Sequence, residues 1–460
     1  MTSAPDIAFK NPGRRAVVAW GFFDWAAQPF FTLITTFVFA PYFASALADN
    51  PTEGQSLWGY ATAAAGLGIA FLAPVLGSVA DATGRRKVWI FCFSIPFVIC
   101  CLAFWYAAPG NPNAVMIALI AFAIGTLSIE IATVFNNAMM PKLVPSTHIG
   151  RLSSFGWALG YASGLVTLVL VLGFLAANPD TGRTLLGFTP LFGLDAATYE
   201  GDRASGPFSA IWYVVFALPM FLFVPDAPSG GKIGAAVSKG LTDLQHSLRH
   251  ARQNRNIFLF LLANMVFKDG LVALFAFGGI YAAGQLGWGS IQIGTFGIIL
   301  TITGTLGLLL SGKVDDRFGP KIVIAFSLIV LMICGLGMIS VDKTTVFFFI
   351  QTPAAPEGAL FASLPEQVFI TLGAIIGAVS GPLQASCRSL LIQLAPKELM
   401  TQYFGLLALS GKVTSFLAPL AVAVVTAAAD SQPAGMSVIL IFFAAGLVLL
   451  MMVKEKRAGQ

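Results

Sequence analysis

Long apolar runs recur along the chain and determine the kind of solvent in which it can fold. A membrane-spanning helix needs about 20 mostly apolar residues, and twelve segments approach or exceed that length. The segments predict an all-α integral membrane protein with twelve transmembrane helices. The predicted helices cover residues 16–47, 57–79, 88–107, 114–139, 152–176, 208–224, 257–284, 291–310, 322–341, 368–394, 403–428 and 436–453.

The low share of charged residues agrees with this class. Only 10% of the 460 residues are charged and 57% are hydrophobic, whereas a soluble domain has roughly 25% charged residues because its surface must be solvated. The formal net charge of +5 does not indicate a nucleic-acid partner, because the basic residues form short clusters between apolar runs. The lipid bilayer is the expected partner of most of the surface.

Lysine and arginine are distributed unequally between alternate loops. One set of loops contains nearly all of them, and the other set contains only Arg183, Arg203 and Lys343. Loops rich in lysine and arginine stay in the cytoplasm, so both termini are predicted to be cytoplasmic. The first apolar run is too long for a cleaved signal. We expect a multi-pass protein of the bacterial inner membrane.

The middle of the chain divides it into two similar halves. Residues 1–228 and 256–460 are each predicted to form a six-helix bundle, joined by an amphipathic cytoplasmic linker at 229–255. The linker is either a helix on the membrane surface or a solvated connector, and its sequence leaves both interpretations open. Two outer loops are long, at 177–207 and 342–367, and the sequence assigns them no role.

A short loop pattern occurs once in each half. In both copies an Asp follows a first Gly by four residues, and a second Gly follows the first by seven. The copies are 235 residues apart, about half the chain, as expected for a parallel internal repeat. The residues are Gly77, Asp81, Gly84, Arg85, Arg86 and Lys87 between the second and third predicted helices, and Gly312, Asp316, Arg317 and Gly319 between the eighth and ninth.

The chemistry of this loop suits a cytoplasmic gate. Glycine lets neighbouring helices approach closely. An Asp at a helix end can form an ion pair with nearby arginines in one conformation, and this pair breaks when the helices move. The alternative interpretation is an anchor of basic side chains on anionic lipid headgroups. Two copies at corresponding places favour the gate.

These loops resemble the cytoplasmic loop signature of the major facilitator superfamily. The stretches Trp20-Gly-Phe-Phe-Asp24-Trp25-Ala26 and Phe39-Ala-Pro41-Tyr42-Phe43 resemble the first helix of the vacuolar amino-acid effluxer family of fungi and its bacterial relatives. This resemblance implies the major facilitator fold and amino acids or similar small zwitterions as substrates. The sequence departs from the family at 27–29 and in the outer loop at 351–366. Further similar stretches are 152–161, Trp212 with Pro219, 386–389 and 404–416.

Ionisable residues inside the predicted helices are candidates for the transport site. Each costs about 2.5–3.5 kcal/mol on insertion scales, so a functional role is expected. The resemblance implies that the first, fourth, seventh and tenth helices line a central cavity, and each of them has at least one such charge. The candidates are Asp24, Glu130, Lys268, Asp269, Arg388 and Lys412, with the polar neighbours Gln28, Asn137 and Gln384.

Each charge has a candidate role. Glu130 or Asp24 is expected to be the carboxylate that couples transport to protons, since burial favours the protonated form. Arg388 and Lys268 are expected to hold a substrate carboxylate, and Asp269 to receive an amino group or to balance Lys268. The alternative is a set of ion pairs between helices that only sets the gate.

Other classes of protein fit the sequence less well. No phosphate-binding loop, metal cluster or nucleophile–base set occurs, so we expect neither an enzyme nor a cofactor. We predict a monomeric secondary transporter that moves a small-molecule substrate with protons by alternating access. Efflux of drug-like or organic-ion compounds is the alternative. Proton-driven uptake is expected to be lost in Glu130→Gln.

Overall fold

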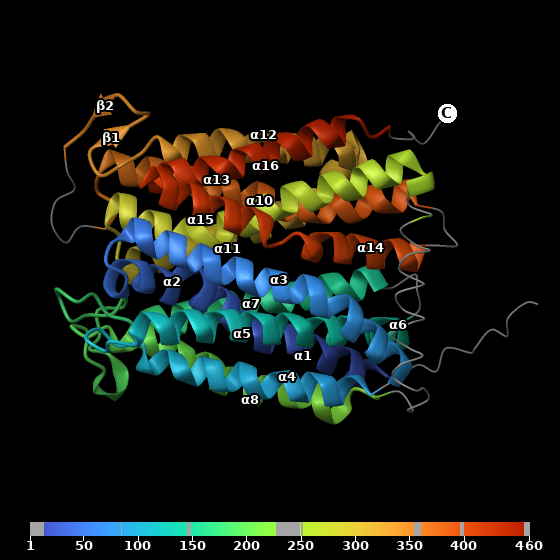
Figure 1. Ribbon diagram of the computed structural model, residues 1–460, viewed down its shortest axis with the longest axis horizontal. Coiled ribbons are helices and arrows are strands. Elements are labelled where there is room, and N and C mark those ends of the chain that lie inside the picture. The colour runs from blue at the N-terminus through green and yellow to red at the C-terminus, as the bar shows by residue number, and fades with distance from the viewer. Residues whose placement is uncertain are drawn as a thin grey trace, which may run out of the picture.

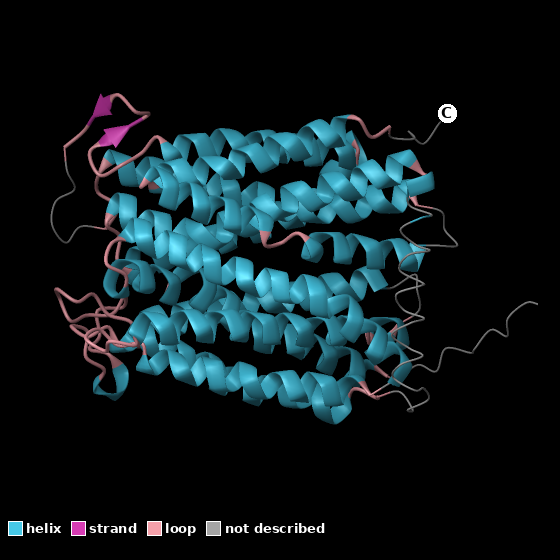
Figure 2. Cartoon of the chain, in the orientation of Figure 1, coloured by secondary structure: helices cyan, strands magenta, loops and turns pink. Residues whose placement is uncertain are grey.

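A computed structural model of the protein describes residues 13–83, 85–144, 149–226, 249, 252–353, 360–395 and 400–454. Most of these residues are helical, and the long helices lie alongside one another (Figure 2). Ten helices of the described part are long and apolar enough to cross a membrane. The all-helical membrane class is therefore confirmed. The count of twelve and the side on which the termini lie stay predictions.

The helices of the first half, α1 to α8, lie together and are blue to green in Figure 1. The last of them, α8, begins earlier than the apolar run at 208, because Glu200 and Asp202 stabilise the start of a helix. The elements are α1 Arg14–Pro29, η1 Phe30–Phe37, α2 Phe39–Tyr42, η2 Phe43–Leu47, α3 Pro51–Thr83, α4 Arg86–Ala103, η3 Phe104–Tyr106, α5 Ala114–Asn137, α6 Met140–Leu143, α7 Ile149–Phe174, η5 Leu191–Gly193 and α8 Glu200–Phe223.

The first predicted span is divided near its middle. Pro29 ends the regular part of α1, because proline has no N–H and crowds the preceding turn. The following segment η1 is a wider π-helix, a form that occurs mostly at functional sites. A side-chain hydrogen bond has the five-residue spacing of a π-helix: Thr36 Oγ1 donates to the carbonyl of Phe31 at 3.0 Å.

The helices of the second half, α10 to α16, are yellow to red in Figure 1. The eleventh predicted span is divided by a turn, in which Leu417 N donates to Thr414 O at 2.8 Å. The two parts, α14 and α15, are too short to count among the ten spans. The elements are α10 Arg255–Leu286, α11 Ser290–Phe318, α12 Pro320–Ile339, β1 Thr345–Val346, β2 Ile350–Gln351, α13 Leu364–Leu394, α14 Met400–Val413, α15 Leu417–Ala429 and α16 Gln432–Met451.

The two ends of the molecule differ. One end contains the hairpin β1–β2 and the loop before α8, and we call it the hairpin end (Figure 1). The other contains the start of α1 and the end of α16, and we call it the terminal end. Most of the predicted amphipathic linker, residues 229–248, 250 and 251, lies outside the described residues.

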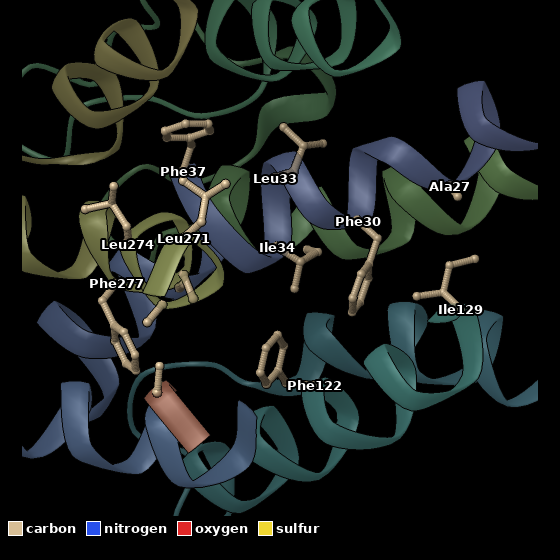
Figure 3. Close-up of a cluster of buried hydrophobic side chains, with 14 of the residues drawn as sticks. Ala27, Phe30, Leu33, Ile34, Phe37, Phe122, Ile129, Leu271, Leu274 and Phe277 are labelled. Carbon is tan, nitrogen blue, oxygen red and sulfur yellow. The ribbon is translucent and has the colours of Figure 1, made fainter. Parts of the chain in front are cut away.

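One buried apolar cluster joins the two halves (Figure 3). It brings together the α1–η1 segment, α5 and α10, which correspond to the first, fourth and seventh predicted spans. Burial of such side chains contributes about 1.5–3 kcal/mol each, and here the contacts cross between the halves. The labelled members are Ala27, Phe30, Leu33, Ile34 and Phe37, with Phe122 and Ile129 of α5, and Leu271, Leu274 and Phe277 of α10.

Candidate functional site

Four of the predicted charges lie on one side of this cluster. In α1 and α10, which run from the terminal end, Asp24, Lys268 and Asp269 precede the cluster residues. In α5, which runs the opposite way, Glu130 directly follows Ile129. All four therefore lie toward the terminal end from the apolar cluster. The cluster separates them from the hairpin end.

Asp24 lies against a glycine of α7. A Cβ atom on Gly156 would collide with Asp24 Oδ2 and would come within 3.1 Å of the Trp20 ring. The carboxylate lies deep among protein atoms yet keeps part of its surface accessible. Within the described part of the chain it has no hydrogen bond and no charged neighbour. An uncompensated carboxylate inside a protein is costly, which indicates a functional group.

The same face of α1 continues this arrangement. Gln28 Nε2 donates to Thr32 Oγ1 at 3.3 Å. A Cβ on Gly160 would lie 3.3 Å from Gln28 Oε1, and one on Gly164 would lie 2.6 Å from Thr32 Oγ1. The polar residues repeat every four positions along α1 and η1, and the glycines repeat every four along α7. The glycines let the two helices approach closely enough to enclose a polar stripe.

Glu130 has a different environment. Its side chain is half-buried, and it interacts with other groups of the protein. Asn137, placed on its face by the sequence, is exposed at the end of α5, whereas the neighbouring Asn136 is buried. The carbonyl of Asn136 accepts from Trp20 Nε1 at 2.8 Å, which ties α5 to α1 near Asp24.

Asp269 in α10 is buried, in contrast to Asp24. The Thr414 hydroxyl at the end of α14 faces its carboxylate. Neither Asp269 Oδ1 nor Thr414 Oγ1 completes a hydrogen bond of ordinary geometry among the described residues. One turn earlier, Asn264 Nδ2 donates to Ser410 Oγ at 3.2 Å. Polar groups of α10 therefore face α14.

Arg388 in α13 is the cationic counterpart of Asp24. Arg388, Lys268 and Asp315 all act electrostatically on the buried thiol of Cys387, so the three charges lie in the same region of the protein. The carboxylate of Asp315 accepts a hydrogen bond from Ser386 Oγ at 2.5 Å. The guanidinium of Arg388 is half-buried, and the described residues provide it with no hydrogen bond or ion pair. Its five donors are therefore available to a ligand.

Gln384 lies one turn before Arg388 and reaches the other half. It interacts with the Tyr161 hydroxyl of α7, whose helix also contacts Asp24. The polar stripes of α1 and α13 are therefore connected through α7. The backbone of Lys412 lies in α14, and its side chain lies outside what the structure describes.

The first copy of the repeated loop is bound to the end of α8. Arg86 N and Lys87 N donate to the Asp226 carboxylate at 3.1 and 3.2 Å, and Lys87 Nζ donates to Phe221 O at 2.8 Å. Arg85 is exposed and Arg86 is buried. Gly84 and the side chain of Asp81 lie outside the described set. Gly77 lies in α3.

In the second copy, Gly312 lies in α11 and Gly319 has a φ of 86°, which glycine adopts freely. Arg317 is exposed, with its guanidinium 5.3 Å from the centre of the Phe318 ring. The side chain of Asp316 is not among those described. The neighbouring Asp315 is the residue that bonds to α13. Whether these loops act as a gate stays a prediction.

A second polar region, which the sequence interpretation missed, joins the halves at the hairpin end. Asp202 at the start of α8 accepts a hydrogen bond from Ser290 at the start of α11. Gln55 of α3 donates to Thr426 Oγ1 at 2.8 Å. Gln432 Nε2 donates to the carbonyl of Pro51 at 3.0 Å. Each bond joins one half to the other, so the hairpin end is closed in this conformation.

Comparisons with known proteins agree with this fold. A family model described as "Vacuole effluxer Atg22 like" matches residues 50–460. The uncharacterized MFS-type transporter YxiO of Bacillus subtilis (strain 168) is 23% identical over 442 residues, 95% of this chain and 94% of that protein. Autophagy-related protein 22 of Coccidioides immitis (strain RS) is 25% identical over 288 residues. That match covers 60% of this chain but 44% of the fungal protein, so the chain spans less than half its length.

A solved structure shows the same architecture. A D-xylose-proton symporter superposes with a TM-score of 0.66 at 13% identity, covering 97% of this chain and 98% of the symporter. At this identity the likeness concerns the fold alone. The family match covers most of the chain, including the residues from α3 onward. The chain is a multi-pass membrane transporter of the major facilitator type, not an enzyme, and it belongs to the Atg22-like family of vacuole effluxers.

Proposed function

We propose that this transporter moves an amino acid or a similar small zwitterion together with protons, by alternating access between its two six-helix halves. One observation carries the proposal: among the described residues, the Asp24 carboxylate and the Arg388 guanidinium make no hydrogen bond or ion pair, and they come from opposite halves of the chain. In this proposal Arg388 binds the carboxylate of the zwitterion, Asp24 takes up the proton, and Asp269 of α10 receives the amino group. Arginine matches the two oxygens of a substrate carboxylate, with Lys268 close by.

The proton is assigned to the carboxylates of the first half, Asp24 and Glu130. A partly accessible carboxylate without a cationic partner is stable only when it is protonated or when a cation binds. Asp24 has these properties in the described structure. Protonation would then act on α1, which packs against α7, and substrate binding would act on α13, which Gln384 connects to α7. We assign the coupling to the two carboxylates together, Asp24 of α1 and Glu130 of α5.

The state seen here fits a carrier closed at the hairpin end. Three side-chain contacts join the halves there, and the apolar cluster lies between them and the charges (Figure 3). In the proposed cycle these contacts open while contacts at the terminal end form. We place the protein in the bacterial inner membrane with the terminal end in the cytoplasm, in agreement with its basic loops.

The test is flux of a labelled amino-acid panel in proteoliposomes, with and without an imposed pH gradient. We expect saturable uptake of one or more amino acids that requires the gradient and is lost in Glu130→Gln. Glu53→Gln, which changes an exposed glutamate at the start of α3, is the matched control and should transport normally. Absence of amino-acid flux under either gradient would contradict the substrate class and would favour efflux of larger organic ions.

A further inference from the structure

The hairpin β1–β2 presents three consecutive phenylalanines at its tip. Thr345 pairs with Gln351 and Val346 with Ile350, which leaves Phe347, Phe348 and Phe349 as the connecting loop. The φ angles of Phe347 and Phe348 are 54° and 68°. Aromatic residues rarely adopt this left-handed conformation, and strained backbone of this kind persists where the surrounding structure holds it for a purpose.

Hydrogen bonds hold the strained loop against the end of α12. Phe348 N donates at 3.0 Å to the carbonyl of Ser340, the residue that directly follows α12. The Asp342 carboxylate accepts from Thr344 N and Thr345 N, each at 2.8 Å. The tip is therefore a built structure that continues directly from α12, and its rings are displayed in a fixed direction.

The rings of the three phenylalanines are largely exposed. Phe347, Phe348 and Phe349 are 44%, 66% and 77% exposed, and the next residue, Ile350, is 41% exposed. Apolar surface on this scale is costly in water, and exposed apolar patches of monomeric proteins mark sites of interaction. A loop facing only water would gain from polar residues here.

The exposed strip on α12 identifies what covers the tip. Phe326, Ile329, Ile333 and Leu336 are all exposed and share one face of the helix. In a membrane-spanning helix that face contacts lipid. The strip ends at Leu336, four residues before Ser340, whose carbonyl accepts the hydrogen bond from Phe348 at the tip. The apolar surface of the hairpin is therefore continuous with the lipid-facing surface.

We propose that the Phe347–Phe349 tip inserts into the lipid headgroup region at the hairpin end and anchors α12 and α13 in the bilayer. Aromatic rings are favoured at that depth, between the acyl chains and water. The partner is the lipid surface itself. A second copy of the chain would be the competing occupant, and the experiment distinguishes the two.

The test measures the depth of a spin label at the tip in phosphatidylcholine vesicles. Cys92 is the one exposed cysteine among the described residues, so Cys92→Ser provides the background for Phe348→Cys. Thr181→Cys, an exposed polar position in the other long outer loop, is the matched control. Collisions with oxygen report lipid, and collisions with a water-soluble nickel chelate report water.

We expect the ratio of oxygen to nickel collisions to be several-fold higher at position 348 than at 181. Equal ratios at the two positions would overturn the proposal, and so would spectral broadening between labels, which would indicate a second copy. A second measurement uses Phe347, Phe348 and Phe349 changed together to Asn, which tolerates left-handed φ. Amide exchange of residues 344–352 in vesicles should then be faster than in the parent protein. Unchanged exchange would contradict the anchor.

Discussion

The two polar regions between the halves of this transporter are built on opposite principles. At the hairpin end Asp202, Gln55 and Gln432 each make a hydrogen bond to the other half. Toward the terminal end Asp24 and Arg388 have no such partner among the described residues. Paired groups hold a conformation, whereas unpaired charges need a ligand. The difference indicates that this conformation is closed on one side and ready to bind on the other.

The largest effect is expected at Asp24. Asp24→Asn keeps the size of the side chain but cannot take up and release a proton, so accumulation driven by a pH gradient should fall to the level without a gradient. Exchange of labelled for unlabelled substrate needs no net proton movement and should persist. The measurement is uptake and counterflow in the same proteoliposomes. Retained accumulation would remove Asp24 from the coupling role.

Arg388 should show the next largest effect, on substrate affinity. Removing one partner of a desolvated charge pair costs about 2 kcal/mol or more, so Arg388→Gln should raise the KM at least about 30-fold. Arg388→Lys keeps the charge but loses the planar fork and should lie between the two. Equal KM values for all three proteins would contradict binding of a substrate carboxylate at this position.

The glycine stripe predicts an intermediate effect that depends on position. Gly156→Ala places a Cβ against Asp24 and Trp20, and overpacking of this kind costs about 1–3 kcal/mol. Gly160→Ala is the matched control, because its Cβ would meet the flexible end of Gln28 at 3.3 Å and would contact Asp24 O and Cβ only at the ordinary distances of 3.7 and 3.9 Å. The thermal unfolding temperature and the transport rate should both fall more in Gly156→Ala than in Gly160→Ala. The reverse order would show that α7 does not support Asp24 as described.

The smallest effect is expected at the hairpin end. One hydrogen bond contributes about 0.5–1.5 kcal/mol net, so Ser290→Ala should shift the conformational equilibrium by about 2- to 13-fold. The shift should open the hairpin end, which faster labelling of Ser56→Cys, a buried position of α3 next to Gln55, would detect. Slower labelling in Ser290→Ala would mean that the bond does not help to close this end.

The sequence was sufficient for the class of fold and for most of the charges of the site. Apolar runs and intramembrane charges are local signals, and their cost in lipid makes them conspicuous. Asp202 was missed because the apolar run begins at 208, although the helix begins at Glu200. The glycines at 156, 160 and 164 have the spacing of small residues at helix contacts, so they could have been recognised. Which helix they face depends on tertiary packing.

The backbone conformation at the interruptions of the first and eleventh predicted spans could not be predicted from the local sequence either. Pro29 predicts an interruption, but the π-helix after it also packs against α7, α8, α10 and α11, and the sequence alone does not show that packing. The turn between α14 and α15 follows no proline, and it places Thr414 opposite Asp269. Such pairings join residues far apart in the chain, and a single sequence does not specify them.

The most direct test of the account is proton movement that accompanies substrate. Proteoliposomes with a trapped pH indicator would receive the transported amino acid without an imposed gradient. We predict that substrate entry acidifies the lumen with the parent protein and with Glu53→Gln, and that Asp24→Asn shows no acidification while still exchanging labelled substrate. Acidification by Asp24→Asn equal to that of the parent would contradict the claim that the Asp24 carboxylate carries the proton.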